Sequence, residues 1–217
     1  MKKIKILIAL GCFSIANIGV AQNEVIDNRE RVTFGLKAGV NFSNIYNSQT
    51  EDFRADGKFG LAGGVALAIP IGQFLGIQPE VLFSQKGFKG DGTFLGSDYS
   101  FKRTTNFIDI PLLIAFKPSA TITILAGPQY SYLLRQRDDF NSSWIDASHE
   151  EEFENENIRN NIFGFVAGVD VNINHFVFGS RVGWDITDNH GDGSSSTPQY
   201  KNVMLQATVG YTLFNSK

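Results

Sequence analysis

The chain has 217 residues, of which 42% are hydrophobic and 19% are charged, and its formal net charge is −3. This length suits a single domain, and the acidic balance excludes the strongly basic footprint of a nucleic-acid-binding protein. Cys12 is the only cysteine, so the chain offers neither an internal disulfide nor a metal site built on several thiolates.

Residues 1–21 have the pattern of a secretory signal peptide. Three lysines lie within the first five residues, an apolar stretch covers residues 6–18, and Gly19-Val20-Ala21 supplies the small residues of a cleavage site. The apolar stretch is too short to cross a membrane as a helix. We predict an exported protein whose mature domain, residues 22–217, begins at Gln22.

Cleavage after Ala21 changes the charge of the chain. It removes three lysines and no acidic residue, which leaves 16 basic and 22 acidic residues and a net charge of −6. It also removes Cys12, so the mature chain has no thiol. A lipoprotein signal that ends at Cys12 is an alternative, but it would leave an even shorter apolar stretch.

Eight later segments alternate between bulky apolar residues and small or polar ones. Successive side chains of a strand point to opposite faces, so each segment has the pattern of a two-faced strand. We expect strands at 33–43, 59–69, 74–87, 103–116, 121–134, 162–172, 176–187 and 201–214. Short connections near 70–73, 117–120 and 172–175 alternate with long polar segments near 44–58, 88–101, 135–160 and 188–200. This rhythm is typical of an outer-membrane barrel with short periplasmic turns and long extracellular loops.

The composition of the two faces indicates which face meets lipid. In 59–69 the bulky face includes Phe59, Leu61 and Leu67, and the opposite face carries only glycine and alanine. Small residues suit the narrow interior of an eight-stranded barrel, and strands can cross a bilayer only as a closed barrel. The sequence therefore predicts an all-β fold: an eight-stranded antiparallel transmembrane β-barrel.

Prolines interrupt three of the expected strands. Pro79, Pro111 and Pro128 each remove a ladder hydrogen bond, and a barrel has no edge strand that could hold them, so we expect bulges there. The segment 125–128 also breaks the alternation of its strand and leaves the direction of its side chains open.

Two motifs resemble the paired signature of the PorT-like outer-membrane β-barrel family: GIQPEVLFSQKG at 76–87 and NFIDIPLLIAFKP at 106–118. Weaker matches are LAGPQYSYLL at 125–134, FGFVAGVDV at 163–171, GSRVGWDIT at 179–187 and KNVMLQATVGYTLF at 201–214. The resemblance implies a Gram-negative outer-membrane location and an eight-stranded fold, but no chemistry. It also implies folding by the barrel assembly machinery, which reads a terminal aromatic residue. Here Asn215, Ser216 and Lys217 follow Phe214.

Four charged residues lie on the inward face near the middle of their strands: Lys37, Glu80, Asp109 and Arg181. Buried charges need partners, so we expect the four to neutralise one another. A salt-bridged plug that fixes the barrel is the favoured interpretation, and a gated or proton-conducting interior is the alternative.

Basic residues gather at the outward ends of the expected strands. We predict that they contact lipopolysaccharide phosphates, because charge-assisted bonds to phosphate are strong; ordinary solubility of polar loops is the alternative. The candidates are Lys58, Lys86, Lys102, Arg103, Arg135, Arg137 and Lys201.

The sequence offers little to a metal ion or to catalysis. Five carboxylates lie within residues 150–156, but a run of charge is usually solvated. Three histidines are present, two in expected loops and one in a short turn, and neither G-x-S-x-G nor H-E-x-x-H occurs. We predict a protein without enzymatic activity, cofactor or metal.

The expected function is structural or adhesive, or the docking of an unknown envelope or surface partner, through the extracellular loops of a barrel in the cell outer membrane. A narrow conduit for solutes is one alternative. A part in secretion or assembly at the outer membrane is another, which the resemblance admits.

Overall fold

The computed structural model describes residues 26–46, 55–94, 97–142, 145–151, 158–190 and 199–216. The expected signal peptide, residues 1–21, and the start of the mature chain at Gln22 lie outside the described residues. No described segment is a helix long and apolar enough to cross a membrane. The strands are β1 Val32–Tyr46, β2 Ala55–Pro70, β3 Leu75–Phe94, β4 Ser97–Phe116, β5 Ile122–Ser142, β6 Ile145–Glu151, β7 Asn161–Ile173, β8 Phe176–Asp185 and β9 Lys201–Ser216.

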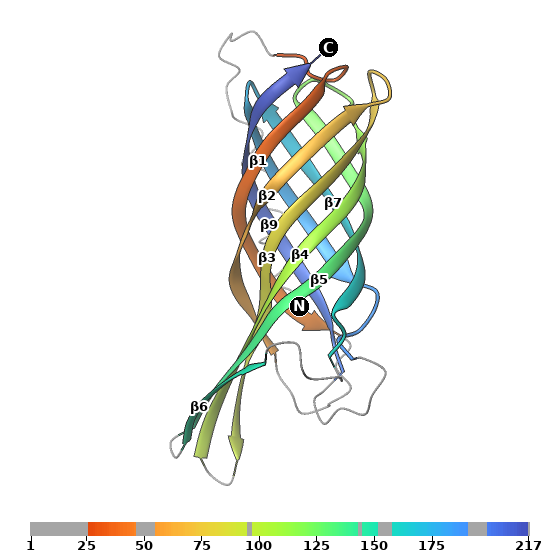
Figure 1. Cartoon of the computed structure of the whole chain (residues 1–217). Helices are drawn as coiled ribbons and strands as arrows, with labels where there is room; N and C mark the ends of the chain where they lie inside the picture. Colours follow the sequence, from red (N-terminus) through yellow and green to blue (C-terminus); the bar gives the residue numbers. More distant parts are fainter. Residues whose placement is uncertain are drawn as a thin grey trace, which may run out of the picture.

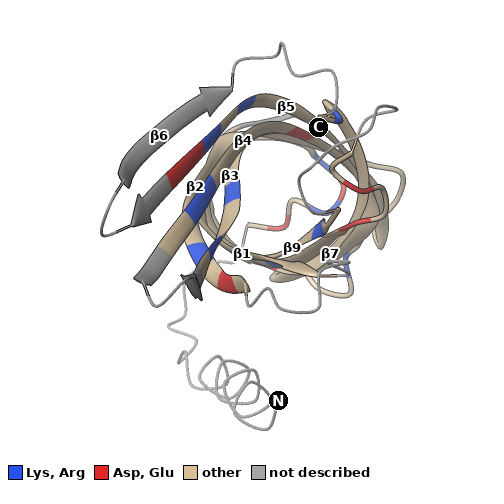
Figure 2. Ribbon diagram, turned by 90° about the horizontal axis from the view of Figure 1, so that it is seen from below, with Lys and Arg blue, Asp and Glu red and all other residues tan. Residues whose placement is uncertain are grey.

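Eight of the strands close into an antiparallel barrel. Neighbours in the sequence pair from β1 to β5, β5 skips β6 to pair with β7, and β7, β8 and β9 follow in order before β9 pairs with β1. The chain winds once around the barrel (Figure 1), and the view along the axis shows a closed ring (Figure 2). The predicted eight-stranded antiparallel barrel is confirmed.

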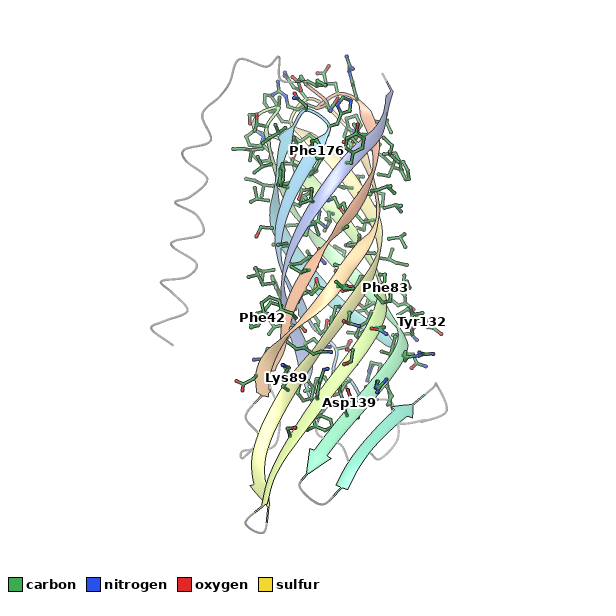
Figure 3. The ribbon with its side chains drawn as sticks, turned by 90° about the vertical axis from the view of Figure 1, so that its left-hand side faces the viewer. Phe42, Phe83, Lys89, Tyr132, Asp139 and Phe176 are labelled. Carbon is green, nitrogen blue, oxygen red and sulfur yellow. The ribbon has the colours of Figure 1, made fainter. Side chains whose placement is uncertain are left out.

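The bulky face of each strand points out of the barrel, as the composition of the faces predicts. Phe59 and Leu61 of β2 are 71% and 63% exposed, whereas Glu80 of β3 and Asp109 of β4 are at most 2% exposed. Large side chains cover the outside of the wall (Figure 3). In a bilayer this outer surface meets lipid, and the polar interior is closed off from it.

The three prolines do not produce bulges. The register runs unbroken through all of them, and each proline keeps a partner on one side: Pro79 with Leu112, Pro111 with Gln129, and Pro128 with Phe165. The expectation of bulges is wrong because proline lacks only one N–H, which points to one neighbouring strand, so pairing with the other neighbour continues.

The register shifts lie elsewhere, between Phe34 and Gly35, between Gly57 and Ala62, and between Asn106 and Phe107. The alternation of β5 also continues through 125–128, with Leu125 pointing inward and 1% exposed.

Three strands extend beyond the barrel at the end that carries the long connections. β3 and β4 stay paired up to Phe94 and Ser97, and β5 pairs with β6 from Gln136 to Ser142. These extensions form a four-stranded sheet that projects from the barrel (Figure 1). We call it the outer sheet and define it as residues 87–94, 97–104, 135–142 and 145–151.

The expected loops at 88–101 and in the first part of 135–160 are therefore strands. A strand with both faces in water has the polar composition of a loop, so composition could not separate the two. Short turns face the periplasm in barrels of this kind, so we call the end with the outer sheet the outer end and the opposite end the periplasmic end.

Candidate functional site in the barrel interior and at the outer rim

The middle of the interior is filled by four charged side chains. Lys37 Nζ lies 3.0 Å from Glu80 Oε1 and 3.0 Å from Asp170 Oδ2. Arg181 Nη2 lies 2.9 Å from Glu80 Oε1 and 3.3 Å from Asp170 Oδ2. All four residues are at most 7% exposed. We call Lys37, Glu80, Asp170 and Arg181 the central ion cluster.

The central ion cluster crosses the barrel. Glu80 is on β3 and Arg181 is on β8, and three strands separate β3 from β8 in either direction around the ring. Two cations face two carboxylates, so the cluster has no net charge. Gln78 Nε2 also donates to Glu80 Oε1 at 2.7 Å. The side chains thus meet across the narrow interior and close it at this level.

The structure brings three of the four predicted interior residues together: Lys37, Glu80 and Arg181. Asp109 does not join them, because it pairs with Leu82 of β3 and so lies one inward-facing position beyond Glu80 toward the outer end. Its carboxylate takes a hydrogen bond from Lys86 Nζ at 3.1 Å instead.

Asp170 is the member of the cluster that the sequence analysis missed. It lies on the same inward face as Gly168, the residue that pairs with Arg181 across β7 and β8. The alternation of β7 could have identified it as a partner for that guanidinium, but its position close to a turn hid its depth in the barrel.

A second closure lies near the outer end, around Arg103. Arg103 Nε donates to Asp138 Oδ1 at 2.7 Å and Nη1 donates to Tyr200 Oη at 3.3 Å. The guanidinium also lies 5.4 to 5.9 Å from the ring centres of Phe88, Phe101 and Tyr200. Burial raises the pKa of the Tyr200 hydroxyl, which stays a neutral partner of the guanidinium.

Two predicted lipopolysaccharide contacts are wrong, because Lys86 and Arg103 point into the barrel and are 2% and 5% exposed. Lys86 shares the inward face of β3 with Glu80, and Arg103 shares that of β4 with Asp109. The other predicted contacts lie at the outer rim: Lys102, Arg135 and Arg137 are exposed, Lys201 is half-buried, and Lys58 is buried there.

A cavity of about 70 Å³ lies on the periplasmic side of the central ion cluster. Lys37 and Asp170 line its inner end, and Asn28 and Arg29, which precede β1, line its periplasmic side. Lys117 Nζ donates to the carbonyl oxygen of Arg29 at 3.3 Å, and burial lowers the pKa of Lys117. The residues before β1 thus cover part of the barrel mouth.

Metal-binding and catalytic groups are not brought together in the part of the chain that the structure describes. No three of its His, Cys, Asp and Glu residues are placed to share a metal ion. His175, in the turn between β7 and β8, stacks on Tyr211 with ring centres 5.8 Å apart. Most of the acidic segment 150–156 lies outside the described residues.

The chain is similar to known proteins. The family model "Outer membrane protein beta-barrel domain" matches residues 20–191, and no curated protein matches the chain. Among solved structures, Ail of Yersinia pestis is 13% identical with a TM-score of 0.43, and the alignment covers 83% of this chain and 99% of Ail. Neisserial surface protein A is 11% identical with a TM-score of 0.45, and the alignment covers 83% and 97% of the two chains. OprG of Pseudomonas aeruginosa is 10% identical with a TM-score of 0.42, and the alignment covers 86% and 98%.

These identities and TM-scores are too low to transfer a function from any of the three proteins. The family match is different, because it spans most of the sequence and includes β1 to β8. The chain therefore belongs to the outer membrane protein beta-barrel domain family.

Proposed function

We propose that this protein is a non-enzymatic barrel that is exported through its signal peptide, is anchored in the outer membrane and docks a partner through the outer sheet. One observation carries the proposal. β6 pairs with β5 over seven residues, from Gln136 with Glu151 to Ser142 with Ile145, and has no second strand neighbour among the described strands. The barrel thus holds an open strand edge outside the membrane.

An open edge can bind an extended peptide. Its free N–H and C=O groups form a row that another strand can complete, a mode that several peptide-binding proteins use. The extension of β3 beyond Gly90, the last residue of β3 that pairs with β2, offers a second and shorter edge. The outer sheet therefore presents two edges, and β6 is the longer one.

The filled interior favours docking over conduction. The central ion cluster and the closure around Arg103 lie one behind the other along the axis. The central ion cluster is fully buried, and in the outer closure Arg103 and Tyr200 are buried while Asp138 is partly exposed. A solute would have to break ion pairs at two levels. A narrow conduit is therefore the weaker alternative, and we expect no conductance steps in planar bilayers.

The two motifs at 76–87 and 106–118 support membership of the PorT-like branch of the family, which we also propose. They lie in β3 and β4, the strands that build one half of the outer sheet. A role in secretion or assembly at the outer membrane would use the same sheet to hold an envelope partner.

A shortened variant tests the docking function. Replacement of residues 139–148 by Asn-Gly keeps Asp138, the partner of Arg103, and removes most of β6. A matched control replaces residues 92–99 by Asn-Gly, which shortens β3 and β4 and keeps β6. Purified full-length proteins are compared on an array of defined ten-residue peptides, with surface plasmon resonance for those that bind.

We expect some peptides to bind the unaltered protein and the control with similar affinity. The same peptides should bind at least tenfold more weakly to the variant that lacks residues 139–148. Equal binding to both shortened proteins, or no bound peptide, would contradict docking at β6. Conductance steps from the unaltered protein would favour the conduit instead.

A further inference from the structure

Three lysines from three strands come together at the base of the outer sheet. Lys89 of β3 and Lys102 of β4 are direct partners in the register. The ammonium group of Lys58 of β2 donates a hydrogen bond to Thr104 Oγ1, two residues along β4 from Lys102. Lys58 is close enough to Lys89 and Lys102 for their charges to act on it. We call Lys58, Lys89 and Lys102 the outer lysine cluster.

Carboxylates balance this cluster only in part. Asp139 of β5 is the register partner of Lys102, but Arg137 Nε already donates to Asp139 Oδ1 at 2.8 Å. Asp56 of β2 is the register partner of Lys89. Among the side chains that the structure describes, the three lysines thus face Asp56 and Asp139, and Asp139 already pairs with Arg137. Like charges on directly opposed residues destabilise a sheet, so the pair of Lys89 and Lys102 calls for an anion.

Lys58 adds to the excess positive charge, and water compensates its charge poorly because the residue is only 7% exposed. Burial and the neighbouring Lys102 lower the pKa of Lys58 to about 8. The next residue, Phe59, is the outermost lipid-facing residue of β2, so Lys58 lies just outside the membrane-spanning part of the strand. A buried ammonium at this place gains most from an anion that also contacts the two exposed lysines.

The height of the cluster above the lipid-facing wall indicates where such an anion comes from. Lys89 follows the lipid-facing Phe83 by six residues on β3, which is about 20 Å along a strand and roughly 15 Å along the membrane normal for a strand tilted by about 40°. Figure 3 shows Lys89 and Asp139 farther toward the outer end than Phe83 and Tyr132. Lys58 directly adjoins the lipid-facing Phe59, so the cluster begins at the edge of the hydrocarbon core, where the headgroup layer starts.

We propose that the outer lysine cluster binds a phosphate group, and that this phosphate belongs to lipopolysaccharide of the outer leaflet. The exposed Lys89 and Lys102 contact the phosphate from two strands, and Lys58 closes the site from beneath. Arg135 is exposed and lies three residues beyond the lipid-facing Tyr132 on β5, nearer the membrane than the cluster, and it extends the same basic rim.

The test uses full-length protein in detergent and native mass spectrometry to count bound lipid. The probes are diphosphorylated lipid A, the same lipid A with both phosphates removed, and inorganic phosphate. The variant is Lys89→Gln with Lys102→Gln, two exposed positions at which loss of charge leaves no buried gap. The matched control is Arg29→Gln with Arg31→Gln, which removes two cations that precede β1 at the periplasmic end.

We expect the unaltered protein and the control to retain diphosphorylated lipid A, and the variant to bind it at least tenfold more weakly. Dephosphorylated lipid A should bind all three proteins equally weakly. Undiminished binding of diphosphorylated lipid A to the variant would overturn the proposal. Inorganic phosphate bound as tightly as lipid A would overturn the assignment to lipid and identify a site for free phosphate.

Discussion

Arg181 on β8 reaches across the barrel to Glu80 on β3, with 2.9 Å between Nη2 and Oε1. The two strands lie on opposite walls, so this ion pair ties together parts of the barrel that share no backbone hydrogen bond. Lys37 and Asp170 complete the charge balance from two further strands. The interior of the barrel is thus a structural element that stabilises the wall.

Loss of Arg181 should destabilise the barrel. Arg181→Met leaves one lysine against two buried carboxylates, and breaking a buried pair in this way costs about 3–5 kcal/mol. We expect a lower free energy of unfolding in detergent, measured by urea titration. Adding Glu80→Gln restores the charge balance and should recover part of the loss, whereas Lys201→Met at the outer end should change little. If the unfolding transition of Arg181→Met were unchanged, the central ion cluster would not contribute to the stability of the barrel.

Replacement by alanine should affect folding differently at two adjacent glycines of β2, Gly63 and Gly64. A Cβ at Gly64 would lie 2.0 Å from the carbonyl oxygen of Val81, but a Cβ at Gly63 would lie 3.4 Å from the nearest atom, the carbonyl oxygen of Lys37. Gly64→Ala must therefore push β3 away, and overpacking of this kind costs about 1–3 kcal/mol. We expect a reduced yield of refolded barrel for Gly64→Ala and a normal yield for Gly63→Ala. Equal yields would show that β2 and β3 approach each other less closely.

The stability of the protein without lipid should rise at alkaline pH because of Lys58. Burial and the charges of Lys102 and Lys89 lower its pKa from the ordinary 10.5 to about 8 in the folded barrel, against the opposing effect of Asp139. The unfolded chain therefore binds more protons between pH 8 and 10.5, and the free energy of unfolding increases with pH over that window. Lys58→Met should abolish this increment. If the free energy of unfolding rose equally with pH in the unaltered protein and in Lys58→Met, the ammonium group of Lys58 would be solvated rather than buried.

The folded protein should show the heat-dependent gel mobility of a closed barrel. Protein extracted from outer membranes should run at one apparent mass without heating and at another after boiling, because the paired strands resist detergent. The soluble periplasmic fraction serves as the control and should lack the protein. A single heat-insensitive band in that soluble fraction would contradict a membrane barrel.

The barrel could be predicted from the sequence because its signals are local. The alternation in 59–69 separates Phe59 and Leu61 from glycine and alanine within a single strand, and connection lengths count the strands without any knowledge of contacts. The same alternation places Lys86 on the face of Glu80, so its inward direction was already present in the sequence, although its position near a strand end made it look like a rim residue.

Only the tertiary structure decided which charges meet and how far the sheet extends. Asp170 joins Arg181 and Asp109 does not, because the tilt and stagger of the strands set the depth of each side chain, and no local pattern records them. Lys58 of β2 reaches Thr104 of β4 across the intervening β3, a contact that the pattern of no single strand records. The outer sheet was not predicted because a strand in water needs no apolar face. Such a strand is defined by its pairing with neighbouring strands, and the sequence of one strand does not show that pairing.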